Sequence, residues 1–166
     1  MTPKYLKFSY RNNLNKLKLI NNLQKKIGFP LVVKPLNEGS SVNVFICNKN
    51  NILKTLTKLN EYGEVLLEKY IPGREIQVAI LENKVLGAIE LRPTRKFYDY
   101  QAKYNPKART EHIIPVEISK REYQELTKIA LKAHKILNCR GVTRSDFRYY
   151  KNSFYLLETN TQPGMT

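Results

Sequence analysis

Two stretches with the pattern of β-hairpins constrain the fold of this chain most strongly. Residues 74–90, "REIQVAILENKVLGAIE", contain two apolar runs separated by Glu82-Asn83, and residues 141–160 repeat the pattern around "KNS" at 151–153. Apolar runs rich in β-branched residues and separated by a short polar turn are typical of hairpins, whose strands pair antiparallel. We therefore expect a chain built around antiparallel sheets.

Further strand and helix signals lie between and before these hairpins. Short apolar runs at 31–34, 42–47 and 64–70 are expected to form strands, the first of them buried. Apolar residues recur at helical spacing in three segments: residues 14–27, residues 51–62 behind Asn51 as the N-cap, and residues 119–137, which open with the capping box Ser119-x-x-Glu122. Strands that dominate, with helices laid on them, predict an α+β fold.

Length and composition limit the class of protein. With 166 residues the chain can form one ordinary domain or two small lobes that share a cleft. Its 42% hydrophobic content indicates a globular protein, and no apolar run approaches the about 20 residues that cross a membrane. The start has no signal-peptide pattern, and Cys47 and Cys139 lack the spacing of a metal or redox motif. We expect a cytoplasmic protein with reduced thiols and no membrane partner.

The net charge of +15 favours polyanionic partners. Because the basic residues are spread along the whole chain, the charge is interpreted first as solvated surface. A basic nucleic-acid-binding module is the alternative, but the aromatic residues are not interleaved with basic ones in an RNA-binding pattern. The sequence therefore gives little support to a nucleic-acid partner.

The last hairpin carries a candidate metal site. If "KNS" is a three-residue turn, Asp146 faces Glu158 and Arg144 faces Asn160, so all four share one face of the sheet. Carboxylate and amide oxygens suit Mg²⁺, and Arg144 would hold an anion or a developing negative charge. A two-residue turn would instead put Asp146 and Glu158 on opposite faces. The alternative interpretation is a surface salt bridge from Arg144 to one of the carboxylates.

Two loops carry candidate phosphate-binding residues. Residues 35–41, "PLNEGSS", follow Lys34 and contain Gly39 and two serines, and such a loop can approach phosphate with its backbone N–H groups. It is not a Walker A loop, and an ordinary hairpin turn is the alternative. The poorly periodic stretch 91–110 is long enough to be functional, and Lys103 and Tyr104 could lie over a polyphosphate or anchor a solvated loop.

The order of five motifs along the chain is more specific than any one of them. They are "VVKPLNEGSS", "EKYIPGRE", "FYDYQAKY", "CRGVTRSDF" and "LLETNTQPGMT". Together they resemble the D-alanine–D-alanine ligases of the ATP-grasp superfamily over essentially the whole chain. The resemblance implies two α+β lobes with mostly antiparallel sheets, residues 1–67 and 68–166, that clamp ATP with Mg²⁺ or Mn²⁺. It also implies a cytoplasmic enzyme of peptidoglycan synthesis. That enzyme phosphorylates one D-alanine to an acylphosphate, which the amine of a second D-alanine attacks.

The resemblance also implies roles for individual residues. Those expected around the nucleotide are Lys34 on the phosphates, Glu68, Lys69 and Ile71 around adenine, Glu75 on the ribose, and Lys103 reaching the phosphates. The loop that covers the site contains Ser40 and Ser41, with Tyr104 closing against Ser40. The expected metal ligands are Asp146, Glu158 and Asn160, and the expected oxyanion donors are Arg144 and the backbone N–H of Gly164.

The chain departs from the family pattern in several places. It lacks the N-terminal domain and the extreme C-terminal segment that hold the two D-alanines, so we expect little activity from this chain alone. A separate chain carrying the missing domain, a homodimer, or a non-catalytic relic that keeps the fold are the open alternatives. Asn43 stands where the family usually has Gly, and Gln101 stands where it usually has Glu.

Overall fold

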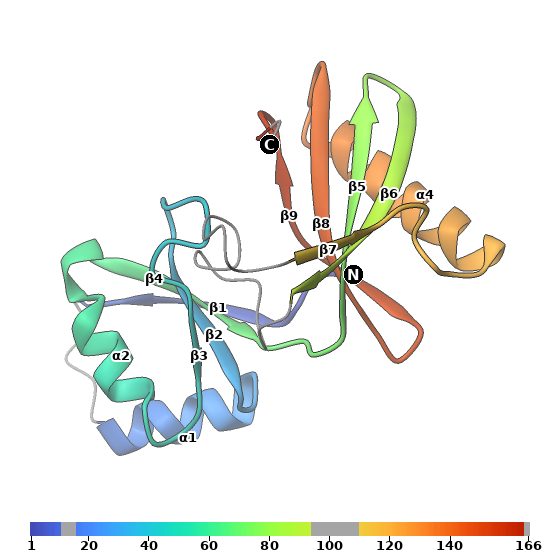
Figure 1. Cartoon of the computed structure of the whole chain (residues 1–166). Coiled ribbons are helices and arrows are strands. Elements are labelled where there is room, and N and C mark those ends of the chain that lie inside the picture. Colours follow the sequence, from blue (N-terminus) through green and yellow to red (C-terminus); the bar gives the residue numbers. More distant parts are fainter. Residues whose placement is uncertain (11–15, 94–109, 165–166) are drawn as a thin grey trace. The chain divides into compact units, whose positions relative to one another are not determined.

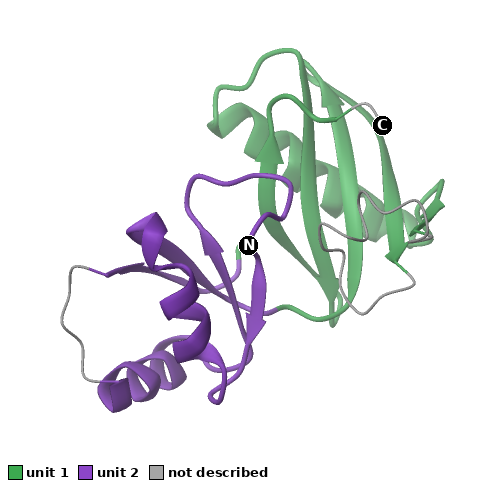
Figure 2. Ribbon diagram, turned by 60° about the vertical axis from the view of Figure 1, so that its left-hand side comes forward, with its two compact units in different colours: residues 1–2, 71–98, 102–166 green, residues 3–70, 99–101 purple. Residues whose placement is uncertain are grey.

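A computed structural model describes residues 1–10, 16–93 and 110–164 of the chain. Its described residues form two compact units (Figure 2): unit 2 comprises residues 3–70, and unit 1 comprises residues 1–2 and the chain from Ile71 onward. The contacts thus divide the chain after Tyr70. The assignment of residues 1–67 and 68–166 as the two functional lobes stays a prediction.

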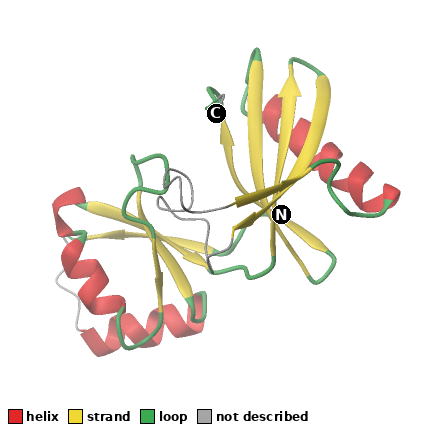
Figure 3. Cartoon of the chain, viewed as in Figure 1, coloured by secondary structure: helices red, strands yellow, loops and turns green. Residues whose placement is uncertain are grey.

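Unit 2 is a four-stranded antiparallel sheet with helices on one face (Figures 1 and 3). Its strand order is β1 (Tyr5–Ser9), β4 (Glu64–Lys69), β2 (Leu31–Pro35) and β3 (Phe45–Cys47). Helices α1 (Lys16–Lys26) and α2 (Ile52–Lys58) pack on the sheet, and the 3₁₀ turn η1 (Asn60–Tyr62) leads into β4. Leu31, Val33 and Leu67 are buried in the core. Because side chains alternate along a strand, Lys34 and Glu68 lie on the face away from the helices.

Unit 1 is a five-stranded antiparallel sheet covered on one face by a long helix (Figure 1). The strand order is β7 (Thr110–Ile113), β6 (Lys84–Pro93), β5 (Arg74–Leu81), β8 (Val142–Tyr150) and β9 (Ser153–Asn160). Helix α4 (Lys120–Ile136) packs Leu126 against Ile76, Val78 and Phe147. We call the opposite face of the sheet, which carries Glu75, Gln77 and Asp146, the distal face. None of the described helices is both long and apolar enough to cross a membrane.

The structure confirms the α+β class and the hairpin at 74–90. The capping box is also present, since Ser119 accepts from the Glu122 N–H and Glu122 accepts from the Ser119 N–H. Asn51 is the N-cap residue of α2, as predicted, but its side chain makes no capping hydrogen bond and instead accepts from Asn48 N at 2.7 Å. The strand expected at 42–47 is shorter and begins at Phe45.

The expected turn of the last hairpin is also wrong, although its consequence holds. Only Lys151 and Asn152 form the turn, and both have positive φ (49° and 57°), as two-residue hairpin loops of type I′ require. A bulge in β9 then shifts the register, so that Phe147 pairs with Leu156 while Asp146 still pairs with Glu158. The bulge restores the face that the two-residue turn alone would have reversed.

Candidate functional site

The three residues expected to bind a metal come together on the distal face. Asp146 lies opposite Glu158, and Arg144 lies opposite Asn160, which confirms the predicted pairing of these four residues. The Asn160 amide nitrogen is 3.3 Å from Asp146 Oδ2 and 3.4 Å from Glu158 Oε1. Two carboxylates and an amide therefore converge on one position at the end of the hairpin.

Arg144 neutralises the buried member of this set. Its Nε and Nη2 donate to the two oxygens of Asp146 at 2.7 and 2.9 Å, and the Asp146 side chain is only 7% exposed. A buried carboxylate requires such a countercharge, because desolvation disfavours the ionised form. The ion pair that was the alternative interpretation is thus present beside the oxygen donors. Two parallel N–H···O bonds also fix the plane of the guanidinium.

The donor set fits a hard divalent cation. Glu158 is exposed, and rotation of the Asn160 amide would turn its oxygen towards the carboxylates. Oxygen donors with open positions for water and phosphate are the environment that Mg²⁺ uses in nucleotide sites. Across the described part of the chain, His, Cys, Asp and Glu nowhere gather in threes as metal ligands. A site here would therefore need the Asn160 amide as its third protein ligand.

Glu75 is fixed on the same face by an arginine that the sequence analysis did not single out. Arg148 Nη2 is 3.2 Å from Glu75 Oε2, and Arg148 Nη1 donates to the Gly73 carbonyl at 3.1 Å. Arg148 follows Asp146 by two residues in β8, so the alternation of side chains could have placed it on this face. Ile71 is half-buried and lies between β4 and β5.

Unit 2 places Lys34 and Glu68 together and Lys69 apart from them. The Lys34 ammonium is 2.7 Å from Glu68 Oε2, on the sheet face away from the helices. Lys69 follows Glu68 and so points to the other face, where its ammonium donates to the carbonyls of Phe29 (2.8 Å) and Gly28 (3.3 Å). The side chains of Glu68 and Lys69 therefore do not meet in this structure.

The Gly-Ser loop has an unusual backbone. Ser40, Ser41 and Asn43 all have positive φ (52°, 60° and 54°), and Val42 N donates to Gly39 O at 3.0 Å. Asn tolerates this left-handed conformation better than most non-glycine residues. The substitution of a usual Gly by Asn43 is thus compatible with the backbone.

The structure gives little information on the other residues predicted for the site. Gly164 is exposed near the end of the described chain. Gln101, Lys103 and Tyr104 lie outside the described residues. Their roles stay predictions.

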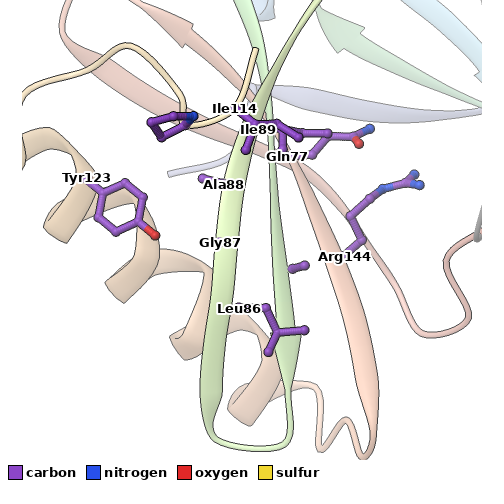
Figure 4. A pocket seen from close by; sticks show the side chains of 10 residues that line it. Gln77, Leu86, Gly87, Ala88, Ile89, Ile114, Tyr123 and Arg144 are labelled. Carbon is purple, nitrogen blue, oxygen red and sulfur yellow. The ribbon is translucent and has the colours of Figure 1, made fainter. Parts of the chain in front are cut away.

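A cavity of about 520 Å³ adjoins Arg144 (Figure 4). Its lining includes Gln77 and Arg144 on one side of β6 and Tyr123 of α4 on the other, so the hollow curves around the edge of this strand. The lining is mainly apolar and does not include Asp146 or Glu158. The metal ligands expected from the sequence therefore lie beside this cavity and not within it.

A second charged cluster lies on the α4 side of the sheet and ties it to the start of α4. Glu90, with a side chain 2% exposed, accepts from Arg74 (3.0 and 2.5 Å) and Arg92 (3.0 and 3.2 Å). Arg74 also donates to the Glu117 carbonyl, and Arg92 to the Glu117 carboxylate. Burial raises the pKa of Glu90, but hydrogen bonds from both guanidiniums outweigh it and hold the pKa below its ordinary value.

Both the sequence and the fold of the chain match those of known D-alanine–D-alanine ligases. The family model described as "D-ala D-ala ligase C-terminus" matches residues 2–166. The chain belongs to the D-alanine–D-alanine ligase family. Its sequence is 61% identical to a D-alanine–D-alanine ligase of Pelagibacter ubique over 166 residues, which is all of this chain and 54% of the relative.

Solved structures of this ligase family share the ATP-grasp fold seen here. The Bacillus anthracis D-alanine–D-alanine ligase superposes with a TM-score of 0.82 at 36% identity, covering 99% of this chain and 53% of that one. The same ligase complexed with ATP gives a TM-score of 0.77 at 34% identity, covering 99% and 52%. The chain thus spans about half the length of the relatives it matches.

Proposed function

We propose that this chain is the ATP-binding portion of a cytoplasmic ligase that joins two D-alanines for peptidoglycan synthesis. Family membership supports the proposal, as does the ATP complex of a structural relative with the same fold. The observation that carries it is the convergence of Asp146, Glu158 and Asn160 beside Arg144 on one sheet face. A surface ion pair alone would not need the exposed Glu158 or the amide between the two carboxylates.

Asp146, Glu158 and Asn160 would hold Mg²⁺ or Mn²⁺. When bound, such a cation would supply positive charge that offsets the negative charge developing during phosphoryl transfer. The residues of this chain act by position. The Asp146 carboxylate is held in one orientation by Arg144, so it need not reorganise when the nucleotide binds. Glu158 is exposed and supplies the second oxygen ligand from the neighbouring strand.

Arg144 and the Gly164 N–H would stabilise the oxyanion formed when the second amine attacks the acylphosphate. A donor held by two hydrogen bonds is aimed before the charge appears, and this is the condition under which fixed donors accelerate acyl transfer. The amine forms the new amide bond, and inorganic phosphate leaves. Ser40 and Tyr104 would close the site against water.

We propose nucleotide-binding roles for residues of each unit. Lys34 would neutralise phosphate charge, and Ser41 and Lys103 would also bind the phosphates. Glu68 and Ile71 would contact the base, and Lys69, whose side chain lies on the other face of the sheet, would contact it through its backbone. Glu75 would accept from the ribose hydroxyls. The Arg148 contact supports the ribose role, because a carboxylate held in place by an arginine presents its free lone pairs in a fixed direction.

D-Alanine would be held by parts of the ligase that this chain does not match. Two-substrate reactions draw about 7–11 kcal/mol from the positioning of their reactants, so a portion that binds ATP without fixing either amino acid should be almost inactive. We therefore propose that activity needs the remaining half of the ligase, in the same polypeptide or in a partner chain.

A thermal-shift titration with MgADP tests the proposed function. A ligand present at 100 times its Kd adds about 2.7 kcal/mol to the stability of the folded state, so the melting temperature should rise with MgADP. In the Glu158→Gln variant, the shift in melting temperature caused by ADP should depend much less on Mg²⁺ than it does in the wild type. Glu125→Gln removes the same charge from an exposed position on α4 and should behave as the wild type. No shift at millimolar MgADP would refute the proposal.

A further inference from the structure

The loop that joins β2 to β3 is held in a conformation that it would not adopt by itself. Three of its residues (Ser40, Ser41 and Asn43) have left-handed backbone angles although none is glycine. Such conformations are disfavoured for non-glycine residues and persist where surrounding contacts determine them. The loop is exposed from Leu36 to Ser40, so buried packing does not hold its first half. One contact with a distant part of the unit lies in its second half.

Asn43 makes that contact. Its amide nitrogen donates to the Tyr62 hydroxyl at 2.7 Å, across 19 residues of sequence. The two ends of this bond differ in rigidity. The Tyr62 ring packs against the buried core of unit 2, and the backbone around it is closed by bonds from Tyr62 N to Leu59 O and from Gly63 N to Asn60 O, both 3.1 Å. Asn43 lies at the end of the loop, two residues before β3 begins.

We propose that Asn43 and Tyr62 form a latch that fixes the direction in which the Gly-Ser loop, residues 36–44 between β2 and β3, enters β3. Tyr62 is the positioning residue, because its ring packs against the core and its hydroxyl accepts the bond from the loop. The bond ties Asn43 to Tyr62 and so restricts the backbone conformations that the loop can adopt around Ser40, Ser41 and Asn43. A further consequence, that the loop N–H groups are already placed for phosphate, rests on the proposed function; the latch itself does not.

Proteolysis after Glu38 measures opening of the loop directly. Glu38 is an exposed residue of the loop, and endoproteinase Glu-C cleaves after glutamate. Cleavage of a transiently opened segment follows the population of the open form when opening and closing are fast. A neutral hydrogen bond contributes enough to change that population about 2- to 12-fold. Tyr62→Phe keeps the ring and removes the hydroxyl, so it should speed the appearance of fragments 1–38 and 39–166 by that factor. The same loss of free energy should lower the melting temperature by no more than about 6 °C.

Two comparisons separate the latch from a general loosening of unit 2. Tyr5→Phe removes the hydroxyl of an exposed tyrosine of the same unit and should leave the rate unchanged. Asn43→Gly removes the amide and permits positive φ, so adding Tyr62→Phe to it should cause no further acceleration. Mass spectrometry distinguishes cleavage after Glu38 from cleavage elsewhere.

The latch is contradicted if Tyr62→Phe is cleaved at the rate of the wild type, or if it accelerates cleavage equally with and without Asn43. Absence of cleavage after Glu38 in both proteins, under conditions that cleave the urea-unfolded chain, would also contradict it, because removal of the bond would then open nothing. MgADP is added in a separate arm. Acceleration by Tyr62→Phe without any protection by MgADP would support the latch and count against the proposed function.

Discussion

Replacing Glu90 by glutamine should destabilise unit 1 by about 3 kcal/mol. The Glu90 side chain is 2% exposed and accepts four hydrogen bonds from Arg74 and Arg92, so the change removes the charge that both guanidiniums face. Removing one partner of a buried ion pair costs about 3–5 kcal/mol. The lower end applies because Arg74 and Arg92 are 32% and 45% exposed, so water can solvate them once the carboxylate is gone.

Urea and thermal unfolding followed by circular dichroism measure this loss. For a chain of this length, about 3 kcal/mol corresponds to a melting temperature lower by about 6–12 °C. Glu117→Gln is the matched control, because Glu117 contacts the same Arg92 but its side chain is 66% exposed. An exposed pair contributes about 0–1 kcal/mol, so Glu117→Gln should lower the melting temperature only slightly.

The effect of Glu90→Gln should also depend on pH. The pKa of Glu90 is lower in the folded protein than its ordinary value of 4.5, so its ionised form adds stability above that value. This stability is lost as the pH falls through the depressed folded pKa. The difference between wild type and Glu90→Gln should therefore shrink below about pH 4. Equal losses for Glu90→Gln and Glu117→Gln at pH 7 would refute the reasoning.

Three further variants test other features. Gly73→Ala should destabilise unit 1 by more than about 2 kcal/mol in a urea titration, because the added Cβ would lie 2.3 Å from Tyr149 O at a φ of 109°. Gly87→Ala is the control and should leave stability nearly unchanged, because its added Cβ meets nothing within 4 Å. Tyr10→Phe should leave stability unchanged or raise it by up to about 1 kcal/mol, since the buried Tyr10 hydroxyl has no hydrogen-bond partner among the described residues and burial raises its pKa to about 12. A loss of more than about 1 kcal/mol would reveal a partner. Phosphate release with ATP and D-alanine should be near background for the 166-residue polypeptide and should rise when the other half of a full-length relative is added; D-alanine-dependent turnover by the polypeptide alone would contradict the proposed division of labour.

The last hairpin shows how far the sequence determines the site. The alternation of Arg144, Asp146, Glu158 and Asn160 predicted their common face correctly. The predicted reason was wrong, since two compensating features, a two-residue turn and a bulge, give the same pairing. A bulge leaves no strong sequence signal, because Leu157 is an apolar residue within an apolar run. Alternation within each strand therefore determined that Arg144 shares a face with Asp146 and Glu158 with Asn160, whereas the common face of the two pairs depended on turn length and bulge position, which needed the structure.

Local pattern also could not reveal contacts between distant segments. The strand β1 is partly exposed and is defined by its pairing with β4, so its own alternation is weak. The position of Lys69 against the carbonyls of Gly28 and Phe29, and of Asn43 against Tyr62, depends on how separate elements pack. Motif order indicated the family from the sequence, but these side-chain partners follow only from the folded chain.

The central claim is that Asp146, Glu158 and Asn160 together hold a divalent cation with a nucleotide. A crystal structure of the protein grown with Mn²⁺ and ADP, with anomalous diffraction data collected at the manganese edge, tests it most directly. We expect an anomalous peak about 2.0–2.3 Å from oxygens of all three side chains, with Arg144 still within hydrogen-bonding distance of Asp146. Bound ADP with its manganese peak elsewhere, or with Asp146 and Glu158 both outside the coordination sphere, would contradict the account.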